Sequence, residues 1–410
     1  MSKPEIESPR LLAFARVTRR RRGAAAVERA WKSLTRKGVP LVETVAGDPT
    51  TRLVTFVWRP TGRVTAPSVS TPISDFTTEG TRLSPVGRTG VYYRPFHLSP
   101  GARATYGFSP RPLPAQAASD EEWYRYNLSV RPDPLNPNRI PTGPKSWSSV
   151  AEVPGGPRAP WDKPRGPLRW KESQRRMRGR GLKGTRPVWV YLPPGYDPAG
   201  VSYNLVIAFD GDAYREAVRT PQVVQNLVEA GRIGPTVLVL VGNAPGGRVP
   251  ELNRNPVFSR FLARELLPWL GRRYRLRVDG SRTVVAGSSL GAIAAVDAAL
   301  RYPRLFSKVL VQSGAFQWPG PGISLMQEFA RSPRRPLRFY LEAGKFETVV
   351  FPGMATSLLG SVRHMRDVLV AKGYPITYSE FDGGHDYACW SGTLGNGLRT
   401  LLGPRRKSAR

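Results

Sequence analysis

The chain has 410 residues, a length that suggests two domains and allows each a buried core. It carries 62 Lys and Arg against 30 Asp and Glu, a formal net charge of +32, so its field favours anionic ligands. One cysteine excludes an internal disulfide, and the three histidines lack the spacing of a metal site. No apolar run reaches the ~20 residues of a membrane span, and the first residues lack a secretory signal. We therefore expect a cytoplasmic protein with no resident metal and no membrane partner.

The front of the chain divides into three predicted parts. Residues 1–45 form a basic, partly helical arm. Over residues 46–138, short alternating segments are broken by Pro and Gly, a pattern that predicts a small antiparallel β-sandwich domain. Residues 139–186 are rich in Pro, Gly and Ser and then strongly basic, as in a linker. The basic stretch could attract an anionic ligand or be merely solvated. With no recognisable binding module, we expect no specific nucleic-acid partner.

Residues 187–403 predict a catalytic domain of the α/β class, followed by a basic tail over residues 404–410. Its apolar strands alternate with helices, which indicates a mostly parallel sheet covered by helices on both faces. The expected strands are 204–209, 236–241, 283–286 and 308–312, and the expected helices are 221–230, 257–270 and 292–300.

The candidate nucleophile is Ser289, in the sequence Gly287-Ser288-Ser289-Leu290-Gly291. This is a G-x-S-x-G motif with a β-branched run before it and an Ala-rich helical stretch after it. Strand, sharp turn and helix are the context in which a strained turn lifts a serine hydroxyl clear of a sheet. Alone the motif would also fit a glycine-rich structural turn. The context favours the fold of the α/β-hydrolases and a nucleophilic serine.

The candidate base is His385, chosen by elimination. His97 lies far upstream in the predicted sandwich, and His364 falls off the apolar stripe of a helix, as a surface histidine would. His385 follows the strand-like 376–381 in an Asp-Gly-Gly loop, which is where a hydrolase with the order serine, acid, histidine carries its base. The alternative is a loop histidine that caps the following helix.

The third catalytic group should be an acid between them, just after a strand. Residues 338–344 read as that strand, and Glu347 follows it, whereas Glu342 is still inside it. We prefer Glu347. Asp382 and Asp386 are alternatives, because both are close to His385 and could orient it or simply cap the loop.

An oxyanion hole needs two donors. The backbone N–H of Leu290 is the first expected donor, because it opens the helix after Ser289. The second should come from Gly211 or Asp212, in the loop after the third strand of the sheet. The sequence Asp210-Gly211-Asp212 could also be a plain turn.

Several motifs together resemble the enterochelin esterase family: residues 286–291, 312–314, 341–347 and 383–386 with 389–392. Weaker similarity extends to 209–212, 248–252 and, in the front half, 55–59 and 133–137. The resemblance implies an N-terminal β-sandwich domain before an α/β-hydrolase domain. Leu290 and Ala292 stand where the family often has a bulky aromatic residue or a second glycine.

The resemblance implies a serine esterase that opens the ester bonds of a ferric catecholate siderophore, with iron present only as part of the substrate. It also implies that Arg248 contacts this anionic substrate, although a salt bridge to Glu251 would fit equally. Trp390, beside the base, would be a wall of the pocket or part of the core. The alternative function is a general carboxylesterase or acyl transferase of the same superfamily. The sequence indicates no oligomeric state.

Overall fold

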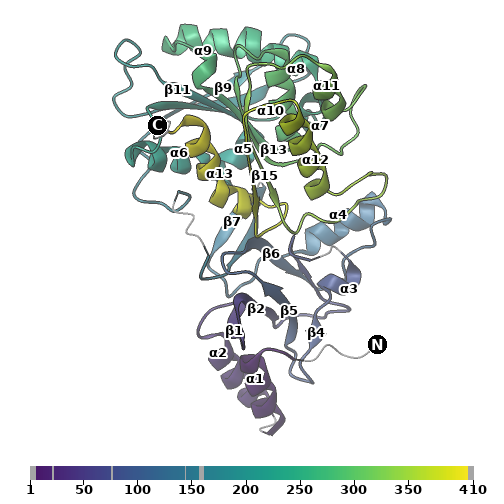
Figure 1. Ribbon diagram of the computed structural model, residues 1–410. Coiled ribbons are helices and arrows are strands. Elements are labelled where there is room, and N and C mark those ends of the chain that lie inside the picture. Colours follow the sequence, from purple (N-terminus) through teal and green to yellow (C-terminus); the bar gives the residue numbers. More distant parts are fainter. Residues whose placement is uncertain (1–5, 21–22, 75–76, 144, 157–160, 405–410) are drawn as a thin grey trace. The chain divides into compact units, whose positions relative to one another are not determined.

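The computed structural model describes residues 6–20, 23–74, 77–143, 145–156 and 161–404 (Figure 1). The described residues divide into two compact units. The first runs to Gly156 and includes the segment Asp382–Ala388, and the second comprises the rest from Trp161 onward. Each unit is built on its own sheet system.

The first unit contains two four-stranded sheets, in the orders β1-β2-β5-β4 and β3-β6-β8-β7, with every pair antiparallel. This confirms the predicted N-terminal β-sandwich. Two short helices accompany the sheets, and a Ser119–Glu122 capping box starts the second of them. The bounds are β1 Leu41–Val45, β2 Asp48–Trp58, β3 Ser68–Ser70, β4 Ser84–Pro85, β5 Tyr92–Leu98, β6 Arg103–Ser109, β7 Arg139–Gly143 and β8 Ser146–Glu152, with α3 Thr78–Thr81 and α4 Asp120–Ser129.

The predicted N-terminal arm is more ordered than its basic composition suggested. Its helices α1 (Pro9–Arg20) and α2 (Ala24–Thr35) bury Leu11, Phe14 and Trp31 in one cluster with residues of β1, β2 and β5. Arg16, Arg19 and Arg20 of α1 are exposed, whereas Arg10 donates to the Leu34 carbonyl oxygen of α2 at 2.6 Å. The helices are amphipathic, which charge content alone does not reveal. Residues 1–5 and 21–22 of the predicted arm lie outside the described residues, as do residues 405–410 of the predicted tail.

The second unit contains an eight-stranded sheet in the order β16-β15-β14-β13-β11-β12-β10-β9. The strands from β16 to β12 are parallel, and β10 and β9 are added antiparallel at one edge. This confirms the mostly parallel sheet. The bounds are β9 Lys171–Met177, β10 Arg186–Leu192, β11 Asn204–Phe209, β12 Thr236–Val241, β13 Thr283–Ser289, β14 Lys308–Gly314, β15 Arg338–Gly344 and β16 Ile376–Phe381.

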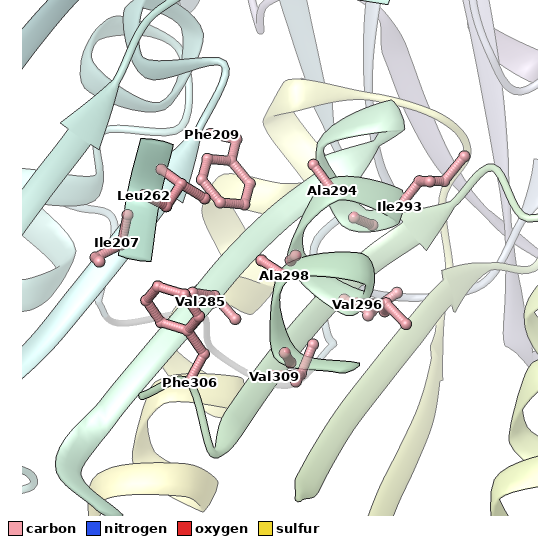
Figure 2. Packing of buried hydrophobic residues seen from close by; sticks show 14 of the residues in the cluster. Ile207, Phe209, Leu262, Val285, Ile293, Ala294, Val296, Ala298, Phe306 and Val309 are labelled. Atoms are coloured by element: carbon pink, nitrogen blue, oxygen red, sulfur yellow. The ribbon is translucent and has the colours of Figure 1, made fainter. Parts of the chain in front are cut away.

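Helices cover both faces of this sheet (Figure 1). Alternate residues of β14 show the two layers: Val309 and Val311 belong to the core shared with α8 to α12, whereas Leu310 contacts Gly397 of α13. In Figure 2, Ala298 of α10 lies near Val285 and Val309 of the strands. The helices are α5 Gly211–Glu216, α6 Thr220–Glu229, α7 Arg248–Leu252, α8 Pro256–Phe261, η1 Leu262–Leu266, α9 Leu267–Tyr274, η2 Gly280–Arg282, α10 Leu290–Arg301, α11 Leu325–Arg331, α12 Leu358–Ala371 and α13 Tyr387–Leu402.

The prediction that residues 139–186 form a linker is wrong for three segments, which are the strands β7, β8 and β9. Strand β7 tolerates Pro141 at a register shift, as edge strands do. Strand β9 is mostly exposed and forms one edge of the second sheet. Its Lys and Arg side chains protect that edge from pairing with other chains, and they also hide the apolar alternation by which strands are predicted.

Candidate active site

Ser289 is the last residue of β13 and directly precedes α10, at the carboxyl end of the parallel strands. Its backbone has φ 55° and ψ −123°, a strained conformation for a residue with a side chain. The turn is tight: a Cβ atom on Gly287 would lie 2.3 Å from the backbone carbon of Gly291. Ser289 remains partly exposed while its neighbours are buried. This is the geometry of a nucleophile elbow.

Leu290 is the first residue of α10, and its side chain is buried. The first N–H groups of a helix have no partner within the helix, so the backbone there can donate to an anion. The backbone carbonyl oxygen of Ser289 accepts the Ala315 N–H at 3.3 Å.

The second predicted oxyanion segment starts a helix and is more than a plain turn. Asp210 has a left-handed backbone, with φ 52° and ψ 48°, and Gly211 opens α5. A Cβ atom on Gly211 would lie 2.7 Å from the backbone nitrogen of Gly242, so this position requires glycine. A Cβ atom on Gly291 would lie 3.3 Å from one carboxylate oxygen of Asp210. The structure therefore brings the segment with Gly211 and Asp212 beside the start of α10.

Arg248 binds Asp210. Its Nε and Nη2 atoms donate to the two carboxylate oxygens at 2.7 and 2.8 Å, and Asn243 donates to the same carboxylate at 2.7 Å. The suggested salt bridge from Arg248 to Glu251 is wrong, because Glu251 is buried against the guanidinium of Arg186 at 2.8 Å. The Arg248 side chain is 41% exposed, so a contact with substrate stays a prediction.

Glu347 lies in the loop after β15, as predicted, and is 5% exposed. One carboxylate oxygen accepts the Gly344 N–H at 3.1 Å, and the Glu347 carbonyl accepts the Leu359 N–H at 3.0 Å. A buried carboxylate fixed to the backbone is suited to hold an imidazole in one orientation.

His385 lies in the loop between β16 and α13, within the segment Asp382–Ala388 that packs in the first unit. Ser289 and Glu347 belong to the second unit. The neighbouring Asp386 is buried, and its carboxylate accepts the backbone N–H groups of Thr105 and, at 2.6 Å, Ala388. This favours the capping role suggested for Asp386. His97 and His364 are both exposed.

Trp390 is 3% exposed, and its indole N–H donates to the Ser313 hydroxyl at 3.0 Å. Of the two roles considered for it, this burial favours the core over a pocket wall.

The sequence analysis did not identify a buried pair of polar side chains in the sheet, Gln312 and Glu342. Glu342 and Gln312 are paired on adjacent strands, and the Gln312 side-chain N–H donates to the Glu342 carboxylate at 2.7 Å. Burial raises the pKa of Glu342 to about 7, against the lowering effect of its hydrogen bonds from Thr393, Gln312 and Tyr340. The available signal was a glutamine and a glutamate interrupting otherwise apolar strands.

Within the described ranges, no group of three or more His, Cys, Asp and Glu side chains is arranged to hold a metal ion. In the same ranges, no helix is long and apolar enough to cross a membrane.

The mostly parallel sheet and the strained serine between strand and helix are those of the α/β-hydrolase class. Residues 179–401, more than half of the chain, match the model of the putative esterase family, and residues 53–162 match that of the enterochelin esterase N-terminal domain. The chain therefore belongs to the putative esterase family.

Curated relatives are similar along most of their length. The iron(III) enterobactin esterase of Dickeya dadantii strain 3937 is 28% identical, over 91% of this chain and 92% of the relative. The iron(III) enterobactin esterase of Escherichia coli strain K12 is 29% identical, over 78% of this chain and 81% of the relative.

Two solved structures are similar to this chain over most of their length. The enterobactin esterase of Shigella flexneri, crystallised in the presence of enterobactin, has a TM-score of 0.74 and 26% identity, covering 90% of this chain and 97% of that structure. The ferric enterobactin esterase of Salmonella typhimurium has a TM-score of 0.75 and 25% identity, covering 91% and 98%.

Proposed function

We propose that this chain is a serine esterase that hydrolyses the ester bonds of a ferric catecholate siderophore of the enterobactin kind, and so releases iron in the cytoplasm. The strained backbone of Ser289 between β13 and α10 is the observation that carries the chemistry. The substrate class rests on the enterobactin esterases to which both halves of the chain are similar.

In the proposed reaction, His385 accepts the proton of Ser289 as its Oγ attacks an ester carbonyl carbon. The tetrahedral intermediate expels the alcohol, which takes that proton from His385, and an acyl-serine remains. Water then attacks the acyl-serine with the same proton relay, releasing the carboxylic acid and restoring Ser289. Glu347 orients the imidazole and stabilises its positive charge.

The negative charge that develops on the carbonyl oxygen needs donors. We assign this role to the backbone N–H of Leu290 and to one backbone N–H from Gly211 or Asp212. Support comes from the approach of Asp210 to Gly291, which places the two helix starts side by side. Each such donor is worth about 3 kcal/mol of transition-state stabilisation.

Two features support a large anionic aromatic substrate. The formal charge of +32 attracts anions over a distance. In addition, the segments that follow β14 and β15 at the carboxyl end of the sheet expose the large apolar side chains of Trp318, Ile323, Val350 and Phe351. Such side chains, together with arginines, suit the flat faces of catechol rings.

The test is to incubate the purified protein with ferric enterobactin and with short p-nitrophenyl esters, beside the Ser289→Ala variant, and to follow the products by mass spectrometry. We expect dihydroxybenzoyl-serine fragments from the native protein alone. Cleavage of only the simple esters would keep the serine chemistry and reject the siderophore, in favour of a general carboxylesterase or acyl transferase.

A further inference from the structure

Within the second unit, a buried chain of hydrogen bonds connects helices α5 and α13 through the side chains of Gln312 and Glu342. The Tyr214 hydroxyl of α5 donates to the Gln312 side-chain oxygen at 3.0 Å. The Gln312 side-chain nitrogen donates to Glu342 at 2.7 Å and to the backbone oxygen of Trp390, in α13, at 3.0 Å. The Thr393 hydroxyl of α13 and the Tyr340 hydroxyl donate to Glu342 as well, the second at 3.0 Å.

The chain of hydrogen bonds ends on both sides at elements of the proposed machinery. Tyr214 lies three residues after Gly211, in the helix that starts with the second oxyanion donor. Trp390 and Thr393 lie in the first turns of α13, directly after the His385 loop. The register also places Gln312 on the strand whose Gly314 pairs with Ser289.

The two central side chains are more polar than folding requires. Gln312 is 0% exposed and Glu342 is 1% exposed, in strands that are otherwise apolar and buried. An apolar pair of the same volume would cost less desolvation and would usually be at least as stable. Within the described part of the chain, no salt bridge compensates the Glu342 carboxyl; its electrostatic neighbours are Tyr340, Glu347 and its hydrogen-bond donors. What the polar pair provides is a fixed geometry between α5 and α13.

We propose that Glu342 is a positioning residue of the esterase, acting through Gln312 to hold the start of α5 and the start of α13 in register with Ser289. The inference rests on the proposed function, because it assigns the two helices to the oxyanion hole and to the base. Glu342 touches no reacting atom in this scheme. The Glu342 carboxyl accepts the Gln312 N–H both when it is protonated and when it is ionised. The positioning role therefore depends on this hydrogen bond and not on the charge of Glu342.

The test uses variants that separate hydrogen bonding from packing. Glu342→Gln keeps an acceptor for Gln312, whereas Glu342→Leu removes it. For p-nitrophenyl acetate, we expect Glu342→Leu to lower kcat roughly tenfold to a hundredfold, because displaced catalytic groups slow the chemical step. The KM should be nearly unchanged, because binding of this small substrate does not depend on those groups. Glu342→Gln should restore most of kcat. Equal kcat in both variants would overturn the proposal.

Two further variants protect the test against a fold that fails. Tyr214→Phe removes one hydroxyl and keeps the packing, so a fall in kcat without a change in KM supports the proposal, and an unchanged kcat contradicts it. The double variant of Gln312→Leu and Glu342→Leu should be no slower than the slower single variant, because both break one chain. Multiplicative losses would mean separate packing effects and would overturn it.

Asp297→Asn is the matched control. Asp297 is an equally buried carboxylate, on α10, bound by Ser259 and Arg301 at 2.8 and 2.7 Å and outside this chain of hydrogen bonds. We expect Asp297→Asn to lower the melting temperature of the protein and to leave kcat unchanged. A fall in kcat equal to that of Glu342→Leu would show that loss of any buried carboxylate slows the enzyme, and would overturn the proposal.

The native protein separates this inference from the proposed function. If it cleaves simple esters but not ferric enterobactin, only the proposed substrate is rejected. If it cleaves neither, the esterase activity is rejected, and the positioning role of Glu342 with it.

Discussion

At the scale of single residues, the site depends on backbone conformations that cost free energy. Ser289 holds φ 55° with a full side chain, a strain of about 1–3 kcal/mol that the surrounding packing must sustain. It persists because β13 and α10 are fixed on both sides by the buried core and because two glycines leave room for the turn. In this conformation Ser289 is partly exposed, while the residues on either side of it are buried.

Gly287→Ala should therefore destabilise the turn. The new Cβ atom would meet the backbone of Gly291 at 2.3 and 2.4 Å, and backbone cannot move aside as a flexible side chain can. We expect a loss of unfolding free energy of at least about 2 kcal/mol in urea denaturation, with loss of activity. Gly62→Ala is the control, because its Cβ would meet nothing within 4 Å, and it should be nearly neutral. Equal stability of the two variants would contradict the tight elbow.

Glu342 gives a prediction about stability and pH. Its pKa is raised from 4.5 to about 7 in the folded protein, so between these values the folded protein holds a proton that the unfolded chain has released. Its contribution is fully present below pH 4.5 and is lost as pH rises through 7, by up to about 3 kcal/mol. Measured from pH 4.5 to 7, the unfolding free energy of the native protein should fall relative to Glu342→Gln. A constant difference would show that the carboxyl is not perturbed.

At the scale of elements, the short helix α7 is held by a buried ion pair. Arg186, on β10, is 0% exposed and pairs with Glu251 of α7, while its guanidinium also lies 5.1 Å from the centre of the Phe261 ring. The same helix carries Arg248, which binds Asp210, the residue before the proposed oxyanion donors. The ion pair therefore fixes the helix that supports one side of the site.

Removing one partner should be costly. Glu251→Leu would leave the Arg186 charge buried and unpaired, so we expect a loss of about 3–5 kcal/mol in the free energy of unfolding. Replacing both residues, as Arg186→Met with Glu251→Leu, should recover most of it, because no buried charge remains. Chemical denaturation of the three proteins measures this. A single variant as stable as the double would contradict a tightly buried pair.

The elements also show how far sequence patterns reach. Strands β11, β12, β15 and β16 have the predicted bounds. Continuous β-branched and apolar runs determine β11 and β12 locally, whereas polar residues alternate with apolar ones in β16. Strand β9 was missed because its charged side chains carry no apolar alternation. The suggested salt bridge between Arg248 and Glu251 is wrong, because each has a partner distant in sequence. Asp210 lies 38 positions from Arg248 and Arg186 lies 65 positions from Glu251, and only the fold brings them together. The roles of Ser289, His385 and Glu347 stay predictions.

At the scale of the whole molecule, charge should control how fast an anionic substrate arrives. A net charge of +32 predicts that kcat/KM for ferric enterobactin falls as salt is raised from about 0.05 to 0.5 M, since screening shortens the range of the field. The same titration with neutral p-nitrophenyl acetate is the control and should give a nearly constant kcat/KM. An equal dependence for both substrates would mean that salt acts on the protein and not on the encounter.

The central claim is that Ser289 forms a covalent acyl intermediate. The most direct measurement is to quench turnover of an ester substrate in acid within milliseconds, digest the protein and locate the added mass by mass spectrometry. We predict one acyl group on the peptide that contains Ser289 and none in Ser289→Ala, which should also lack turnover. An acyl group on another residue, or undiminished turnover by Ser289→Ala, would contradict this account.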